Sequence, residues 1–188
     1  IIGLLLGFIV GFMFASNMSQ RQTLQAASQN LPPNHPQVQS GDSRNPQQVF
    51  ADVQAAIGKA RNEPNNFEAQ VKAAELYYQI QRYDQAIEYL LKANQLQPDS
   101  YETIVALGQV NVDAQHYEQA EKWLETALMK KPEDGKVLVS LTFALLQKGD
   151  ALAATKAIET LEKVDPENQN LPEFRDRLAS LKSGEKPK

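Results

Sequence analysis

The sequence predicts an all-α protein in which one membrane-spanning helix precedes a stack of paired helices. Two observations lead to this prediction. Residues 1–15 are apolar and uncharged. The four prolines Pro64, Pro98, Pro132 and Pro166 each lie 34 positions after the one before, and a fixed period of about 20–50 residues is typical of stacked supersecondary repeats.

Residues 1–15, IIGLLLGFIVGFMFA, are expected to form the membrane-spanning helix. A span needs about 20 apolar residues, so the stretch is slightly short. Because the chain starts at Ile1 and not at Met, we expect upstream residues to complete it. The alternative is the apolar region of a signal peptide, about 7–15 residues long. Residues 14–17, Phe-Ala-Ser-Asn, make a poor cleavage site, which favours a single-pass anchor in a bacterial inner membrane.

Small residues recur at every fourth position of this segment, as Gly3, Gly7, Gly11 and Ala15. On a helix this spacing aligns them in one stripe. In lipid, small residues let two helix backbones approach closely and gain packing. The stripe therefore predicts docking against other transmembrane helices, with the opposite face in the lipid bilayer. Composition alone is the alternative explanation, because Gly is common in such helices.

Residues 16–45 are predicted to be a polar tether rich in Gln, Asn, Ser and Pro. Such a segment buries too little apolar surface to offset the entropy lost on ordering. Pro32, Pro33 and Pro36 end any helix that continues from the membrane segment. We interpret the segment as a spacer and not as a domain.

Three repeats follow, at residues 67–100, 101–134 and 135–168. Their eighth positions hold Ala74, Gly108 and Thr142, and their twentieth positions all hold alanine, at 86, 120 and 154. Small residues are required where the two helices of a hairpin approach closely. Position twenty-four holds Leu90, Leu124 and Ile158, which are large enough to fill the space between neighbouring hairpins.

In this register the segment resembles a tetratricopeptide repeat array. The first repeat fits the family pattern throughout, with Ala74, Tyr77, Ala86, Leu90, Ala93 and Pro98. The second departs at Asn111, where the family has an aromatic residue, and the third departs at Thr142 and Leu161. Position four, usually large and apolar, holds Gln70, which we expect if the first repeat has an unusual neighbour. The resemblance implies a right-handed α-α superhelix, a solenoid of three repeats with capping helices.

The predicted capping helices lie at residues 46–62 and 171–182. Asn45 and Pro46 form an N-cap and first helical position. Residues 183–188 are expected to be a frayed tail. Polar outer faces on terminal helices are what an exposed solenoid end requires.

The resemblance also implies that the first helix of each repeat lines a concave groove for protein partners. The predicted lining is Val71, Glu75, Tyr78, Val105, Gln109, Val112, Lys136, Val139, Phe143 and Leu146. Exposed apolar surface of this kind usually marks a protein contact. The alternative is that flanking helices or the tether fill the groove internally. At the positions where some family members grip a chaperone's terminal carboxylate, only Lys136 has a suitable side chain, so that ligand class is not expected.

Composition and motifs narrow the remaining function classes. The net charge of −4 argues against a nucleic-acid partner, because such proteins need Lys and Arg to neutralise phosphates. There is no cysteine, and neither His35 nor His116 has a partner at metal-site or triad spacing. We therefore expect no enzyme, cofactor or metal site. The hypotheses are an accessory subunit of a membrane complex, an assembly factor resembling anchored proteins of cytochrome c maturation, or a secreted adaptor after signal cleavage.

Overall fold

The computed structural model describes the backbone of residues 46–184 and the side chains of residues 51–184. The predicted membrane helix at 1–15, the tether at 16–45 and most of the tail lie outside the described residues. Within residues 46–184 all regular structure is helical, and no helix there is both long and apolar enough to cross a bilayer. The helices are α2 (Pro46–Asn62), α3 (Phe67–Gln79), α4 (Tyr83–Leu96), α5 (Tyr101–Asp113), α6 (Tyr117–Lys130), α7 (Gly135–Lys148), α8 (Ala151–Val164) and α9 (Leu171–Ser183).

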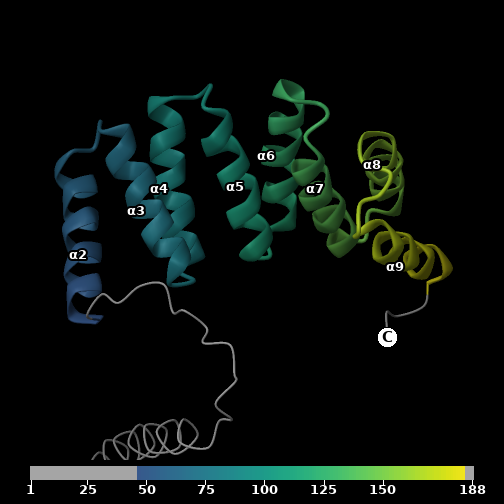
Figure 1. Ribbon diagram of the computed structural model, residues 1–188, viewed down its shortest axis with the longest axis horizontal. Helices are drawn as coiled ribbons and strands as arrows, with labels where there is room; N and C mark the ends of the chain where they lie inside the picture. Colours follow the sequence, from purple (N-terminus) through teal and green to yellow (C-terminus); the bar gives the residue numbers. More distant parts are fainter. Residues whose placement is uncertain (1–45, 185–188) are drawn as a thin grey trace, which may run out of the picture. The chain divides into compact units, whose positions relative to one another are not determined.

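These helices pack as successive hairpins, each against the next along the array (Figure 1). The pairs α3–α4, α5–α6 and α7–α8 are the three repeats, while α2 and α9 pack on the two ends. The first helices of the second and third repeats also meet, since α5 contacts α7, and the capping helix α9 contacts α7. The all-α prediction and the stacked-hairpin architecture are confirmed for this part of the chain.

The same turn closes each hairpin. Gln81, Gln115 and Gly149 adopt positive φ values of 59°, 61° and 78°, and they lie 34 residues apart. In the first turn the amide N–H of Arg82 donates to the carbonyl oxygen of Tyr77 over 2.8 Å, and this bond recurs one repeat later. Such bonds satisfy helix carbonyls that would otherwise lack partners. The left-handed residue at this point is therefore a requirement of the repeat.

The first helix of each repeat begins at a side-chain cap. Asn66, Ser100 and Asp134 accept hydrogen bonds from backbone N–H groups in the first turns of α3, α5 and α7. These residues directly follow the Pro-containing turns, so proline stops one helix and the cap starts the next.

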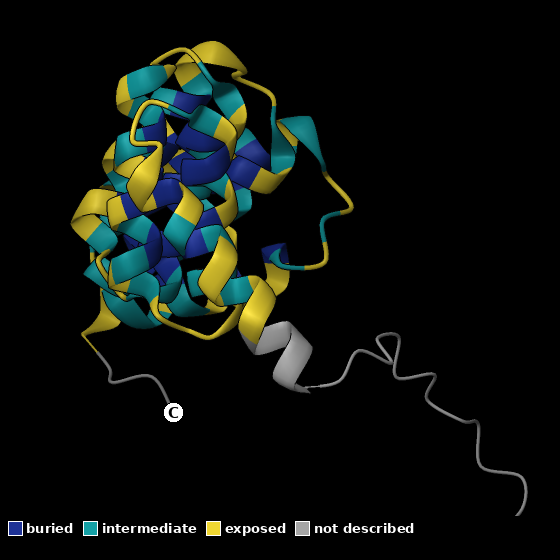
Figure 2. Cartoon of the chain, turned by 90° about the vertical axis from the view of Figure 1, so that its left-hand side faces the viewer, coloured by how far each residue is buried: buried dark blue, intermediate teal, exposed yellow. Residues whose placement is uncertain are grey.

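The hydrophobic core divides into two clusters of different composition, and buried residues lie inside the stack (Figure 2). The N-terminal cluster contains five fully or almost fully buried alanines, at 60, 69, 73, 74 and 86. The C-terminal cluster contains Leu138, Leu141, Leu145, Ile158 and Phe174. Small side chains therefore dominate one end of the array, and large ones fill the other.

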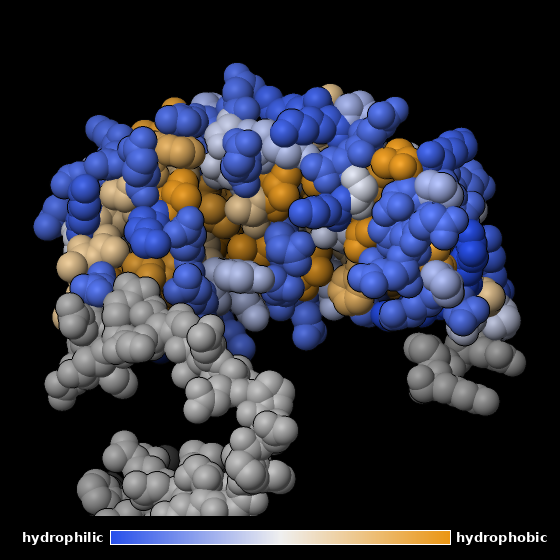
Figure 3. All heavy atoms as spheres, viewed as in Figure 1, coloured by the Kyte–Doolittle hydropathy of each residue, from blue (hydrophilic) through white to orange (hydrophobic). Residues whose placement is uncertain are grey.

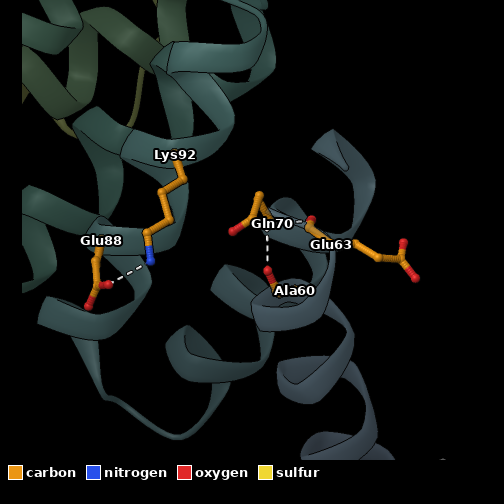
Figure 4. A network of polar contacts seen from close by, with 5 residues as sticks. All are labelled: Ala60, Glu63, Gln70, Glu88 and Lys92. Carbon is orange, nitrogen blue, oxygen red and sulfur yellow. Dashed lines mark hydrogen bonds and ion pairs between the residues drawn. The ribbon is translucent and has the colours of Figure 1, made fainter. Parts of the chain in front are cut away.

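Gln70 is the buried polar exception in the first repeat. Its side-chain Nε2 donates to the carbonyl oxygen of Ala60, in the last turn of α2, over 2.8 Å and to that of Glu63, directly after α2, over 3.2 Å (Figure 4). The last carbonyls of a helix lack partners within that helix. The unusual neighbour expected from the sequence is thus a helix end, which Gln70 caps where an apolar side chain could not.

Candidate protein-binding groove

A hollow of about 530 Å³ runs between α3 and α5. Buried Leu90 of α4 and Val110 of α5 border it, and Figure 3 shows apolar surface among hydrophilic side chains in the region of these helices. Four predicted groove residues line it: Val71, Glu75, Tyr78 and Gln109. The structure adds Phe67, Ala74, Gln97, Ser100, Glu102, Thr103 and Ala106 to the lining.

The lining of the hollow includes small side chains on both of its first helices. Ala74 belongs to α3 and Ala106 to α5. Large side chains usually fill such spaces in protein interiors, because close packing gains dispersion energy and buries apolar surface. Leu90 and Val110 close the buried side of the hollow, and the remaining space stays open to solvent.

A chain of polar side chains crosses the three first helices at one edge of this surface. The Tyr78 hydroxyl of α3 donates to Asp113 Oδ2 of α5 over 2.7 Å. Gln109 Nε2 donates to Asp113 Oδ1 over 3.4 Å, and Ser140 Oγ of α7 donates to Gln109 Oε1 over 2.9 Å. The hydrogen bond to Asp113 is the main reason that the pKa of Tyr78 rises to about 12. Two polar residues of the lining are thus already engaged.

The third repeat presents a closed surface at the corresponding place. Val112 and Leu146 are only 8% and 3% exposed and belong to the C-terminal core cluster, together with Phe174 and Leu178 of α9. Predicted from the sequence as groove lining, these two residues are core residues in the structure. For Leu146 the physical reason is that α9 packs against α7, whereas Val112 lies on α5, one repeat earlier, where α5 contacts α7. The expected alternative of a flanking helix filling the groove therefore describes this end of the array.

Phe143 is also held in this packing. Its ring meets the ring of Tyr117 edge-on at 6.4 Å, and the guanidinium of Arg177 in α9 lies 5.7 Å from its centroid. Val105 and Val139 are partly buried against the same cluster. Lys136 is exposed and borders a separate hollow with Val139, Asp134 and Asn168. The predicted groove lining is therefore divided, and its open apolar part lies between α3 and α5.

A second polar pair fixes the start of the third repeat. The Tyr101 hydroxyl donates to Asp134 Oδ2 over 2.7 Å. This bond lowers the pKa of Asp134, with backbone N–H donors contributing, while burial and the same bond raise the pKa of Tyr101 to about 12. Asp134 thus acts both as the cap of α7 and as a partner of α5.

No group of three or more His, Cys, Asp or Glu residues within the described part of the chain is placed to hold a metal ion. The side chains of the hollow are mostly apolar, with carboxylates, amides and hydroxyls at its edges. This arrangement is suited to binding a chain segment through its side chains.

Comparisons with known proteins identify the fold. Residues 81–138 match the family model described as tetratricopeptide repeat. The fold is that of a tetratricopeptide repeat array. No curated relative matches the chain.

Solved structures with the same fold share little sequence. A MamA fragment from Desulfovibrio magneticus RS-1 is 17% identical, with a TM-score of 0.59 over 74% of this chain and 88% of that one. The Arabidopsis OM64 TPR domain is 14% identical, with a TM-score of 0.55 over 63% and 98%. The first TPR of Spaghetti (RPAP3), bound to the HSP90 peptide SRMEEVD, is 17% identical, with a TM-score of 0.56 over 62% and 93%.

Proposed function

We propose that the repeat array is a protein-binding scaffold without a catalytic role. The observation that supports this proposal is the open apolar hollow between α3 and α5, which the chain's own described side chains leave unfilled. A structurally similar repeat domain holds a peptide, which supports binding of a chain segment by this fold. The proposed binding residues are those of the hollow, with Val71 and Ala106 on its walls.

Site-specific photo-crosslinking tests this function. A benzophenone amino acid at position 106 of the full chain in its native membrane should capture a partner, whereas the same group at exposed Met129 of α6 should not capture that species. Val71→Arg places a charge in the hollow and should abolish the adduct. An adduct that persists in this variant, or no adduct at position 106, would contradict the proposal.

The chemistry of the hollow argues against a ligand like the peptide held by the Spaghetti domain. SRMEEVD ends in acidic residues and a carboxylate. Apart from Tyr78, the ionisable side chains of this lining are Glu75 and Glu102, which are also acidic. Like charges brought close together repel. Excess SRMEEVD should therefore leave the crosslink at position 106 unchanged.

We further propose that residues 1–15 anchor the scaffold in a bacterial inner membrane as an accessory subunit of a larger complex. The uncharged apolar segment and its stripe of small residues support this role. Anchoring would raise the concentration of the hollow near membrane partners. Gly7→Leu should leave the chain in the membrane after carbonate extraction but reduce its co-purification with the complex. Leu4→Ile, away from the stripe, is the matched control.

Unchanged co-purification of Gly7→Leu would refute docking through the stripe. An assembly factor would instead show an association that depends on the presence of a newly made client and on Val71. Mass measurement of the mature N-terminus distinguishes both from a secreted adaptor, since cleavage would remove the segment.

A further inference from the structure

We propose that the occupant of the α3–α5 hollow is an amphipathic helix that pairs apolar anchors with Lys or Arg side chains. This inference rests on the proposed function of the hollow and specifies the chemistry of its partner. It follows from the charge of the lining, from its length and from the hydrogen-bonding groups that it leaves available.

The charge of the lining is acidic. Glu75 and Glu102 belong to the walls, and no Lys, Arg or His does among the described residues. Asp113 adds a third carboxylate next to Tyr78. A ligand that carries cations beside its apolar side chains would therefore meet charges of opposite sign, which favours both its approach and its orientation.

Both wall carboxylates are accessible to such a ligand. Glu75 pairs with Lys72 at 3.0 Å, but the two side chains are 53% and 58% exposed. Exposed ion pairs contribute little, about 0–1 kcal/mol, so an incoming cation can share or replace this one. Glu102 is exposed in the first turn of α5 and forms no hydrogen bond or ion pair with another residue of the described part.

The available hydrogen-bonding groups favour a helix over an extended peptide. Tyr78 and Gln109 bond to Asp113 and Ser140, and the hydroxyls of Ser100 and Thr103 bond to each other at 2.9 Å. An extended segment buried here would find few partners for its backbone N–H and C=O groups. A helix satisfies these groups internally and presents only side chains.

The length of the hollow agrees with this conclusion. Its α3 wall extends from Phe67 to Tyr78, which corresponds to about 16 Å of helix at a rise of about 1.5 Å per residue. A helix of about three turns spans that distance. Its residues at i, i+3, i+4 and i+7 would face Val71, Ala74 and Ala106, while flanking Lys residues would reach Glu75 and Glu102.

Two matched peptides test the inference against the full chain in zwitterionic detergent micelles, with empty micelles as blank. The probes are fluorescein-labelled LKKLLKKLLKKL and LEELLEELLEEL, followed by fluorescence anisotropy. We expect the Lys peptide to bind at least about tenfold more tightly than the Glu peptide. The double variant Glu75→Lys with Glu102→Lys should reverse that preference. Glu125→Lys with Glu159→Lys, which has the same net charge but alters residues outside the hollow, should retain it.

The outcomes separate this inference from the proposed function. If both peptides bind equally and Val71→Arg abolishes both, the hollow binds protein but the charge inference is wrong. If the preference for Lys survives the Glu75/Glu102 reversal, the inference is also overturned. If neither peptide binds and position 106 captures no partner, the proposed function itself fails. Circular dichroism of each variant verifies that the array remains helical.

Discussion

The junction between α3 and α5 and the junction between α7 and α9 occupy equivalent places in the repeat, yet the first is open and the second is closed. Tyr78 is 39% exposed at the first, whereas Leu146, two repeats later in the same register, is 3% exposed at the second. The first junction has alanines on its facing walls, and the second has Phe174 and Leu178 supplied by α9. In a repeat fold, therefore, side-chain volume and the identity of the neighbouring helix decide whether a groove position is a binding surface or core.

The largest expected effect concerns access to the two equivalent positions. The chain has no cysteine, so Tyr78→Cys and Leu146→Cys each introduce one thiol. A maleimide should label Cys at 78 about 100-fold faster, because labelling at 146 requires local opening of the α7–α9 packing. Adding Phe174→Ala to Leu146→Cys should remove most of the difference. Equal rates in the single variants would show that the second junction is also open.

Truncation of a core leucine should also distinguish the two ends. Leu161→Ala in the filled C-terminal cluster should lower the free energy of unfolding by about 2–5 kcal/mol. Leu90→Ala should cost less, because its side chain already borders the hollow and the new space joins it. Thermal unfolding followed by circular dichroism measures both, and Leu152→Ala, at a side chain 71% exposed, is the control. A larger loss for Leu90→Ala would contradict this account of the hollow.

The middle hairpin is tightly closed at position eight. A Cβ atom on Gly108 would lie 2.6 Å from Leu124 Cδ2 and 2.7 Å from its Cγ. Gly108→Ala should therefore destabilise the array by about 1–2 kcal/mol, since overpacking of about 1–3 kcal/mol exceeds the helix-propensity gain of up to about 1 kcal/mol. Differential scanning calorimetry measures the change. Gly58→Ala, where the added atom meets nothing within 4 Å, should be neutral or stabilising.

Acid should weaken the link between the second and third repeats. The pKa of the Asp134 carboxyl is lowered in the folded state. The ionised carboxylate therefore stabilises the fold above its unfolded-state pKa of about 3.9, and this contribution is lost as pH falls through the folded-state pKa. Asp134→Asn keeps a capping side chain but loses the charge. It should cost about 1 kcal/mol at neutral pH, and the difference from the parent should shrink below about pH 4. Thermal unfolding across this range would reveal a constant difference if the charge were irrelevant.

The smallest expected effect is at the hairpin turns. Gln115 adopts φ 61°, where the third repeat has Gly149. Because a left-handed conformation costs a residue with a Cβ about 1 kcal/mol, Gln115→Gly should raise the unfolding free energy by about 0.5–1 kcal/mol. Gln119→Gly, inside α6, should lower it. A fall in melting temperature for Gln115→Gly would mean that the glutamine side chain makes a compensating contribution.

Much of the fold could be predicted from the sequence because its signals are local and periodic. The prolines, the small residues at positions eight and twenty, and the capping residues specify helical hairpins without reference to distant contacts. The departure at Asn111 is accommodated inside the second repeat, where buried Asn111 Nδ2 donates to the carbonyl oxygen of Leu107 over 2.7 Å.

The groove was less predictable because it depends on contacts between repeats. Val71, Glu75, Tyr78 and Gln109 were predicted from register and do line the hollow. Glu102 and Ala106 were missed, although a search for small residues on facing first helices would have found Ala106. Burial of Leu146 required knowledge of where α9 packs, which its spacing along the sequence does not specify. The predicted membrane segment and its glycine stripe remain predictions.

Gln70 gives the array a defined first member. A solenoid built from equivalent units can in principle be lengthened at either end by inserting another copy. At this end, however, the glutamine amide is matched to the terminal carbonyls of one particular helix. A helix ending one turn earlier or later in the place of α2 would bury that amide without partners, so the length of the first helix is tied to the repeat that follows it.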